Sequence, residues 1–272
     1  MQNSMPKVDI LNIPITNATL QQALNFSMDA LGDATSKTTI FTPNPEIIWL
    51  ANNNAELNHA LQEADILIPD GIGVVIASKI LKNPLQERVA GFDLLCEILK
   101  NSAKKSYKVF LLGGRPGVAS RARENLQRKY TNIKIVGTCN GYFNAEQDAE
   151  IIDKINNSGA DFLAVALGAP KQELWITKYR AQLKPRLCIG VGGALDVIAG
   201  SVKRAPKLWQ RAGLEWLYRL LKEPKRLPRM MSIPKFLLKV MLSPKNKKQP
   251  EKQELPQQNT PEQNDKTETK VG

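Results

Sequence analysis

Asp70 is the residue whose position most suggests chemistry, because it closes an apolar run and opens a glycine-rich turn. The stretch 66–75 reads ILIPDGIGVV. This pattern predicts a buried strand that delivers Asp70 to a turn at its carboxyl end, followed by a helix to about Leu81. Ligands of open α/β sheets bind in the crevice beyond the carboxyl ends of the strands. A carboxylate there is placed to act on a ligand, and the alternative is that Asp70 only caps the next helix.

A second predicted strand end presents Thr42 and Asn44. The stretch 38–42 reads TTIFT and runs into PNPE, whose two prolines enforce an extended turn before a helix. Thr42 and Asn44 are therefore expected at the same edge of the sheet as Asp70. For Asn44 the alternative is again a helix cap.

If this protein binds phosphate, arginine, lysine and backbone amides must neutralise its charge. The turn GGRPG at 113–117 could hold phosphate at the start of a helix, although most such turns are only connections. GVGGALD at 190–196 lacks the third glycine of a dinucleotide-binding motif, and neither a P-loop motif nor a D-x-D pair occurs. We therefore expect no metal and no cofactor.

Strands alternate with helices through most of the chain, which predicts the fold class. Further predicted strands cover 108–113, 133–136, 162–167 and 187–191, and further predicted helices cover 118–130, 145–156 and 172–181. Repeated βα units imply an α/β, Rossmann-like, mainly parallel sheet with helices on both faces. KVDILNIPI near the start predicts a short pair of strands. His59 and the three cysteines show no metal-ligand spacing and are expected to be structural.

The positive charge of the chain is concentrated in one segment. The net charge is +12, and residues 203–248 hold 14 Lys and Arg against two acidic residues. We therefore divide the chain into an α/β domain (1–202), a basic helical appendage (203–243) and a polar tail (244–272) that is expected to be disordered. An anionic partner is expected for the appendage only.

The appendage ends in an apolar stretch, IPKFLLKVML at 233–242. Ten residues are too few to cross a bilayer, but they could lie in its interface. The alternative is a helix packed on the body with its lysines solvated. The chain opens without the pattern of a signal peptide and has an odd number of cysteines, so a reducing cytosolic location is expected.

Several stretches, taken in order, resemble the WecG/TagA/CpsF glycosyltransferase family (glycosyltransferase family 26). They are TPNPE, LIPDGIGVV, the ER-V-AG-D-L run at 87–94, LLGG with a following PG, ALGAPKQE at 166–173 and GVGGALD-x-x-AG. The match spans roughly residues 8–230. Their shared order makes the resemblance more specific than any single motif.

The resemblance implies an inverting glycosyltransferase that moves a sugar from a UDP-sugar to a polyprenyl-diphosphate-linked N-acetylglucosamine. Such an enzyme would be cytoplasmic and peripheral on the inner leaflet of the cell membrane. The resemblance is also compatible with a homo-oligomer. The members it most resembles transfer N-acetylmannosamine in a β-1,4 linkage that begins wall teichoic acid. UDP-glucose and UDP-N-acetylmannosaminuronate stay open as donors. A non-enzymatic nucleic-acid binder is disfavoured, because the basic segment carries no recognised DNA or RNA motif.

The resemblance also implies the roles of individual residues. Asp70 matches the general base and Thr42 its neighbour in the active site. An inverting transfer needs only one such base, and arginines can hold the leaving diphosphate in place of a metal. Tyr142 and Asp196 are expected near the uridine, and arginines of the appendage at the diphosphate. The full set of expected substrate-binding residues is Asn44, Arg88, Tyr142, Gln172, Asp196, Arg219, Arg226 and Arg229.

Overall fold

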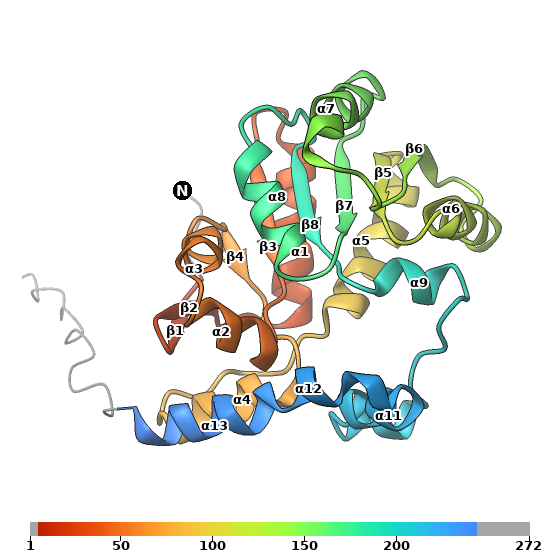
Figure 1. Cartoon of the computed structure of the whole chain (residues 1–272). Coiled ribbons are helices and arrows are strands. Elements are labelled where there is room, and N and C mark those ends of the chain that lie inside the picture. The colour runs from red at the N-terminus through yellow and green to blue at the C-terminus, as the bar shows by residue number, and fades with distance from the viewer. Residues whose placement is uncertain (1–4, 244–272) are drawn as a thin grey trace, which may run out of the picture.

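A six-stranded parallel sheet forms the centre of the protein in the computed structural model, which describes residues 5–243 (Figure 1). In spatial order the strands are β4 (Ile66–Leu67), β3 (Thr38–Phe41), β8 (Leu187–Gly190), β7 (Phe162–Ala166), β5 (Lys108–Gly113) and β6 (Lys134–Cys139). Every neighbouring pair in this sheet is parallel. The predicted α/β fold with a mainly parallel sheet is confirmed. The tail predicted for 244–272 lies outside the described residues.

Helices cover both faces of the sheet, because alternate strand residues point to opposite sides. Val109 and Leu111 of β5 belong to one buried apolar cluster, and Phe110 and Leu112 belong to the other. The first cluster is closed by α1 (Leu20–Gly32), α5 (Gly91–Lys105), α6 (Val118–Lys129) and α9 (Ala194–Ile198). The second is closed by α2 (Pro45–Ala51), α3 (Ala55–Gln62), α4 (Ile72–Ile80), α7 (Asp148–Asn157) and α8 (Lys171–Tyr179).

The strand pair expected near the start is also present. β1 (Lys7–Ile10) and β2 (Ile13–Thr16) form an antiparallel hairpin separate from the main sheet. The hairpin contributes to the second cluster through Val8 and Ile15, and the Oγ1 atom of Thr16 accepts a hydrogen bond from the N–H of Leu67. This bond ties the hairpin to the edge strand that leads to Asp70.

One strand is longer than the sequence predicts. A strand was expected only over 133–136, whereas β6 continues to Cys139 and includes Gly137, a residue that disfavours strands. The β5–β6 register shifts between Val109 and Phe110, and a Cβ at position 137 would lie 2.3 Å from Phe110 Cε2. Gly137 therefore leaves room for the Phe110 ring, a tertiary constraint that local periodicity does not report.

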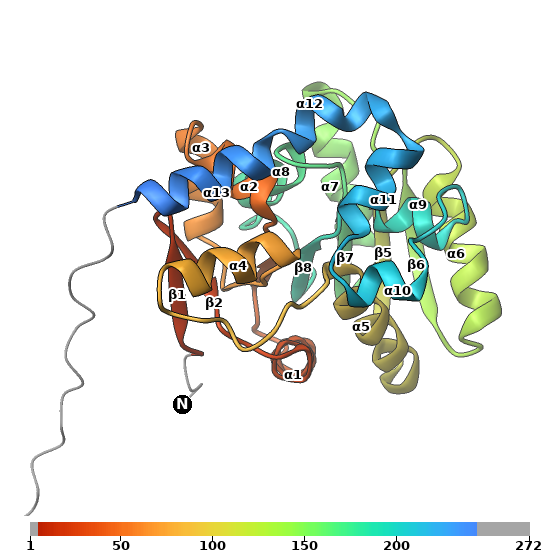
Figure 2. The same ribbon diagram turned by 90° about the horizontal axis from the view of Figure 1, so that it is seen from below.

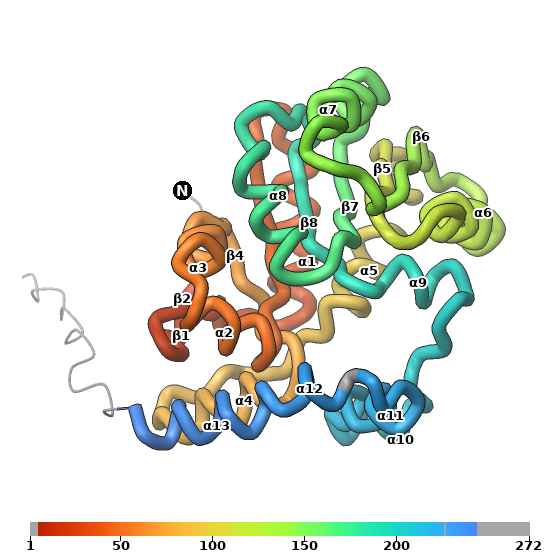
Figure 3. Tube along the Cα trace, in the orientation of Figure 1, coloured from red at the N-terminus to blue at the C-terminus, as the bar shows by residue number. Residues whose placement is uncertain are grey.

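The basic appendage packs along the carboxyl edge of the sheet as a series of short helices. These are α10 (Lys207–Arg211), α11 (Glu215–Lys222), the 3-10 turn η2 (Pro224–Arg226), α12 (Leu227–Met230) and α13 (Ser232–Leu242). Figure 2 shows α13 running beside α4, and Figure 3 shows the chain crossing from α9 to α10 and α11 through an extended stretch. Phe236 and Val240 of α13 are fully buried in the second cluster, so this helix packs on the body.

Candidate active site

The predicted site residues come from turns at one edge of the sheet. Because all six strands are parallel, their carboxyl ends meet at the same edge. Thr42 follows β3, Asp70 follows β4, Gln172 follows β7 and Asp196 follows β8. The fold therefore places side chains from distant parts of the chain at the edge where ligands of such sheets bind.

Asp70 is held by irregular pairing that continues beyond the ends of β3 and β4. The N–H of Ile68 donates to the carbonyl of Phe41 at 2.9 Å, and the N–H of Asp70 donates to the carbonyl of Pro43 at 3.2 Å. Regular strand structure ends at Leu67, since Pro69 offers no N–H to the ladder. The observed strand is thus shorter than the sequence predicts, and Asp70 lies in the turn beyond its carboxyl end.

The carboxylate of Asp70 does not cap the following helix. The N-cap of α4 is Gly71, which has a φ of 88°, and this cap makes no side-chain hydrogen bond. A Cβ at Gly73 would lie 2.6 Å from Cγ of Pro45, so this glycine allows the helix to pack against the turn that holds Thr42. Of the two interpretations of Asp70, the structure therefore excludes the helix cap, and a contact between the carboxylate and a ligand stays a prediction.

The surroundings of Asp70 raise its pKa to about 6. Burial is the main cause, because it disfavours the charged form, and the negative charge of Glu215 adds to it. Arg88, Arg219 and the N–H of Gly91 lower the pKa in partial compensation. A carboxylate with this pKa is mostly ionised at pH 7, while its affinity for a proton is high enough to accept one from an alcohol during attack.

Thr42 and Asn44 have different surroundings. Asn44 Oδ1 accepts a hydrogen bond from the N–H of Ile47 at 3.0 Å and so caps α2, which was the alternative stated for it. Thr42 lies against the first turn of α5, since a Cβ at Gly91 would be 2.8 Å from its Oγ1. Gly91 is also the residue whose N–H hydrogen-bonds to Asp70. Thr42 is therefore a close neighbour of the candidate base.

Gln172 is buried and uses both ends of its amide within the protein. Its Oε1 accepts the N–H of Gly192 at 2.9 Å, and its Nε2 donates to Oε1 of Glu173 at 2.8 Å. Burial raises the pKa of Glu173, whose Oε2 has no hydrogen-bond partner among the described residues. Gln172 thus fixes the glycine turn after β8, and its contact with a substrate stays a prediction.

Arg88 reaches the appendage. Its Nη2 donates to the carbonyl of Gln210 at 3.1 Å, and its Nη1 lies 3.8 Å from Oε1 of Glu215. Glu215 also pairs with Arg204 at 3.2 Å, and Arg204 forms a bidentate pair with Asp93 in the first turn of α5. Sequence reasoning missed Glu215, Arg204 and Asp93. The available signal was that Glu215 is one of two acidic residues in a strongly basic segment.

The three predicted arginines of the appendage differ in what they contact. Arg219 of α11 acts electrostatically on Asp70. The Nε atom of Arg229 lies 2.7 Å from Oε1 of Glu46 in the first turn of α2. The side chain of Arg226 lies outside what the structure describes.

Tyr142 follows β6, the edge strand farthest from β4, yet its loop folds back over the sheet. The N–H of Gly141 donates to the carbonyl of Gly114 at 2.8 Å, and a Cβ at Gly141 would lie 3.0 Å from Cδ2 of Leu167. The side chain of Tyr142 is 69% exposed, so its ring is open to a ligand that could stack on it. Asp196, expected to share the uridine site, lies half-buried in the first turn of α9.

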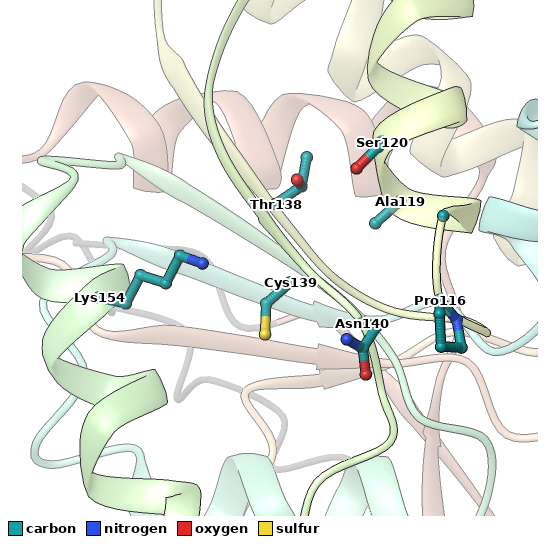
Figure 4. Close-up of a pocket in the computed structure, with 8 residues that line it drawn as sticks. Pro116, Ala119, Ser120, Thr138, Cys139, Asn140 and Lys154 are labelled. Atoms are coloured by element: carbon teal, nitrogen blue, oxygen red, sulfur yellow. The ribbon is translucent and has the colours of Figure 1, made fainter.

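Two cavities lie away from Asp70. One of about 200 Å³ is enclosed by the GGRPG turn, the start of α6 and the end of β6, and Figure 4 shows Thr138, Asn140 and Lys154 around it. Its Asn140 accepts the N–H of Tyr142 through Oδ1 at 2.9 Å. The other, about 870 Å³, lies between α13, the β1–β2 hairpin and the end of α2.

No group of three or more His, Cys, Asp or Glu side chains in residues 5–243 is arranged to hold a metal ion. No helix in that range combines the length and the apolar character needed to cross a membrane.

Comparison with known proteins identifies the family. The model of the glycosyl transferase WecG/TagA/CpsF family matches residues 8–250. An N-acetylglucosaminyldiphosphoundecaprenol N-acetyl-beta-D-mannosaminyltransferase of Bacillus spizizenii is 43% identical over 202 residues, which cover 74% of this chain and 78% of that protein. Proteins of the same name from Bacillus subtilis and Staphylococcus aureus are 39% and 37% identical over 240 residues, covering 88% of this chain and 93% and 94% of theirs. The chain belongs to the WecG/TagA/CpsF glycosyltransferase family.

Proposed function

We propose that this protein is an inverting glycosyltransferase that moves N-acetylmannosamine from a UDP-sugar to undecaprenyl-diphosphate-linked N-acetylglucosamine. The relatives named above carry this activity in their names and cover most of the chain. The observation that supports it best is the placement of Asp70 at the carboxyl edge of the sheet. Its carboxylate does not cap α4, has a raised pKa and is acted on electrostatically by Arg88 and Arg219. In this proposal the product serves wall teichoic acid or a related surface polysaccharide.

In the proposed reaction a hydroxyl oxygen of the acceptor attacks C1 of the donor sugar. The hydroxyl proton passes to the carboxylate of Asp70 as the new C1–O bond forms. The bond from C1 to the β-phosphate oxygen breaks on the opposite face, and its electron pair leaves with UDP. One base is sufficient for this displacement, because UDP is already an anion of low basicity and needs no general acid.

Arginines are proposed to balance the charge that develops on the leaving diphosphate. Guanidinium groups bind phosphate oxygens in bidentate geometry and stay protonated at any working pH. Arg88 and Arg219 both act electrostatically on Asp70, which supports a common site for the base and these two cations. The proposed chemistry therefore assigns no step to a metal ion.

We assign the uridine to the turns beyond β6 and β8, where Tyr142 and Asp196 lie. The backbone on both sides of Tyr142 is held in place, since Nζ of Lys171 lies 3.4 Å from the carbonyls of Gly141 and Phe143, while the ring itself is exposed. A flat, solvent-exposed ring on a fixed loop suits stacking with a pyrimidine base.

The proposed location is the inner face of the cell membrane, where a polyprenyl diphosphate is anchored. The outer side of α13 exposes Leu238 and Met241, at 57% and 61%, and Lys235 of the same helix is exposed too. Lys239 is half-buried, with its Nζ 5.7 Å from the centre of the Trp49 ring. Apolar side chains flanked by lysines suit an anionic lipid surface, where each nearby cation contributes about 1 kcal/mol. Because the other side of α13 is part of the core, the test changes Leu238 and Met241 to serine rather than deleting the helix. The double variant should no longer sediment with vesicles of anionic lipid, and unchanged sedimentation would contradict the proposed location.

The decisive experiment incubates the purified protein with a short-chain lipid-linked N-acetylglucosamine and a panel of UDP-sugars. Transfer of N-acetylmannosamine with inversion at C1 supports the proposal. Exclusive transfer of glucose or N-acetylmannosaminuronic acid would replace the proposed donor while keeping the family mechanism. Absence of transfer from every donor would refute the proposed activity.

A further inference from the structure

Glu215 is an acidic residue at the centre of a cluster of arginines. It lies in the first turn of α11, and its Oε1 is 3.8 Å from Nη1 of Arg88 and 3.2 Å from Nη2 of Arg204. Its side chain is only 17% exposed. A carboxylate that is removed from water and shared by two guanidinium groups holds both of them in place.

The ion pairs continue from Glu215 to the body of the protein. Arg204 contacts Asp93 through both terminal nitrogens, with Nη2 at 3.0 Å from Oδ2, and its guanidinium lies 4.5 Å from the centre of the Phe92 ring. Asp93 and Phe92 belong to the first turn of α5, next to Gly91. A chain of four charges, defined here as the latch, therefore joins Arg88, Glu215, Arg204 and Asp93.

The latch joins α11 to the first turn of α5, where the N–H of Gly91 hydrogen-bonds to Asp70. Arg219 lies one turn after Glu215 on the same helix, and both residues act electrostatically on Asp70. The groups that shift the pKa of Asp70 are Arg88 from the loop between α4 and α5, Gly91 from α5, and Glu215 and Arg219 from α11. Any displacement of α11 would move two of these four groups.

We infer that Glu215 is a positioning residue for the transfer reaction: by joining Arg88 to Arg204 it holds α11, and with it Arg219, over Asp70. This inference rests on the proposed function of the site. Glu215 touches no reacting atom in this scheme. Its negative charge also sustains the affinity of Asp70 for the proton that Asp70 must accept.

The test replaces Glu215 by glutamine, which keeps the shape of the side chain and removes its charge. Glu97→Gln is the matched control, because Glu97 lies on α5 and pairs with Lys100 at 3.1 Å in a partly exposed contact outside the latch. Glu215→Gln should lower kcat/KM at the pH plateau at least tenfold and should shift the acidic limb of the pH profile to lower pH. The shift is expected because loss of a nearby negative charge, and any exposure of Asp70 to water, both lower the pKa of Asp70. Glu97→Gln should change neither quantity.

A second comparison separates positioning from a general loss of stability. If Glu215 and Arg204 act through one latch, Arg204→Gln should lower the plateau value of kcat/KM to a similar extent. The double variant should then lose no more kcat/KM than the worse of the two single variants. Two results would show a merely structural role and would overturn the inference. One is a fall in the plateau of kcat/KM without a shift of the acidic limb of the pH profile, and the other is fully additive losses of kcat/KM in the double variant. Wild-type kinetics in Glu215→Gln would overturn it as well.

A measurement without turnover distinguishes failure of this inference from failure of the proposed function. Amide hydrogen exchange over 215–222 should be faster in Glu215→Gln than in the wild type and in Glu97→Gln. If the wild type transfers no sugar, the proposed function fails, while faster exchange in Glu215→Gln alone still supports the latch. Equal exchange in all three proteins refutes the latch whatever the activity.

Discussion

The Nε atom of Arg229 lies 2.7 Å from Oε1 of Glu46, which joins the appendage to the first turn of α2. Arg229 is half exposed, at 56%, so this pair contributes at most about 1 kcal/mol to stability. If Arg229 also meets the acceptor diphosphate, Arg229→Ala should raise the KM for the lipid acceptor severalfold with little change in Tm. Glu46→Gln breaks the same pair without removing the guanidinium, so its KM should stay near the wild-type value. Equal kinetic defects in the two variants would contradict a role for Arg229 in substrate binding.

Gly213, between α10 and α11, offers a test of how closely the appendage must pack. It has a φ of 72°, and a Cβ there would lie 2.7 Å from Cβ of Ile72, two residues after Asp70. Gly213→Ala should therefore push the appendage away from the Asp70 turn and reduce kcat/KM at least tenfold. Gly200→Ala is the control, because Gly200 has a φ of 76° but would meet nothing within 4 Å. In both variants the alanine must adopt a left-handed conformation, which costs about 1 to 2 kcal/mol. Only Gly213→Ala should show the additional loss of kcat/KM.

Replacement of Asp70 by asparagine should lower kcat by ~10² to 10⁴, the usual contribution of a positioned general base. The KM for the UDP-sugar should change little, because the proposed role of Asp70 concerns the acceptor proton. Asp153→Asn, an exposed position on α7, serves as the control for loss of a carboxylate. Turnover by Asp70→Asn within threefold of the wild type would exclude Asp70 as the base.

Asp70 should also make the folded state less stable as the pH rises. Its pKa is about 6 in the folded protein against 3.8 for an unperturbed aspartate, so the folded state binds the proton more tightly. Stability is therefore lost progressively as the pH rises from about 4 through 6, by about 3 kcal/mol at most. Asp70→Asn should consequently melt at a higher temperature than the wild type at pH 8, with the difference vanishing near pH 4. An equal or lower Tm at pH 8 would show that the carboxylate is not destabilised by its surroundings.

Transfer should continue in excess EDTA at an unchanged rate, since arginines are proposed to hold the leaving diphosphate. The measurement compares initial rates with and without the chelator, and again after Mg²⁺ is restored. A rate that falls with EDTA and recovers with Mg²⁺ would contradict the assignment of this role to arginine.

The fold and several site positions could be predicted from the sequence because they depend on local patterns. Alternation of apolar strands with helices indicated the parallel sheet, and the apolar run before Asp70 indicated a strand end. Whether Asp70 and Asn44 cap helices could not be decided, since both interpretations fit the same pattern. The structure separates them: Asn44 caps α2, whereas Gly71 takes the cap position that Asp70 could have filled.

The remaining features depend on contacts between distant residues. Arg204 pairs with Asp93, which lies 111 positions earlier in the chain, and no local pattern reports such a pair. The sequence of α13 also fitted two interpretations, a helix in the membrane interface and a helix packed on the body. Phe236 and Val240 face the core, so the packed-helix interpretation is confirmed for that side. Leu238 and Met241 face outward, and their contact with a membrane stays a prediction.

The order of the chain has a consequence for how the protein is made. β8, which completes the sheet, ends at Gly190, whereas Glu215 and Arg219 come later in the sequence. A polypeptide still emerging from the ribosome can therefore complete its sheet before the groups that tune Asp70 have been synthesised. If Glu215 and Arg219 have their proposed roles, sugar transfer should begin only after translation has passed α11.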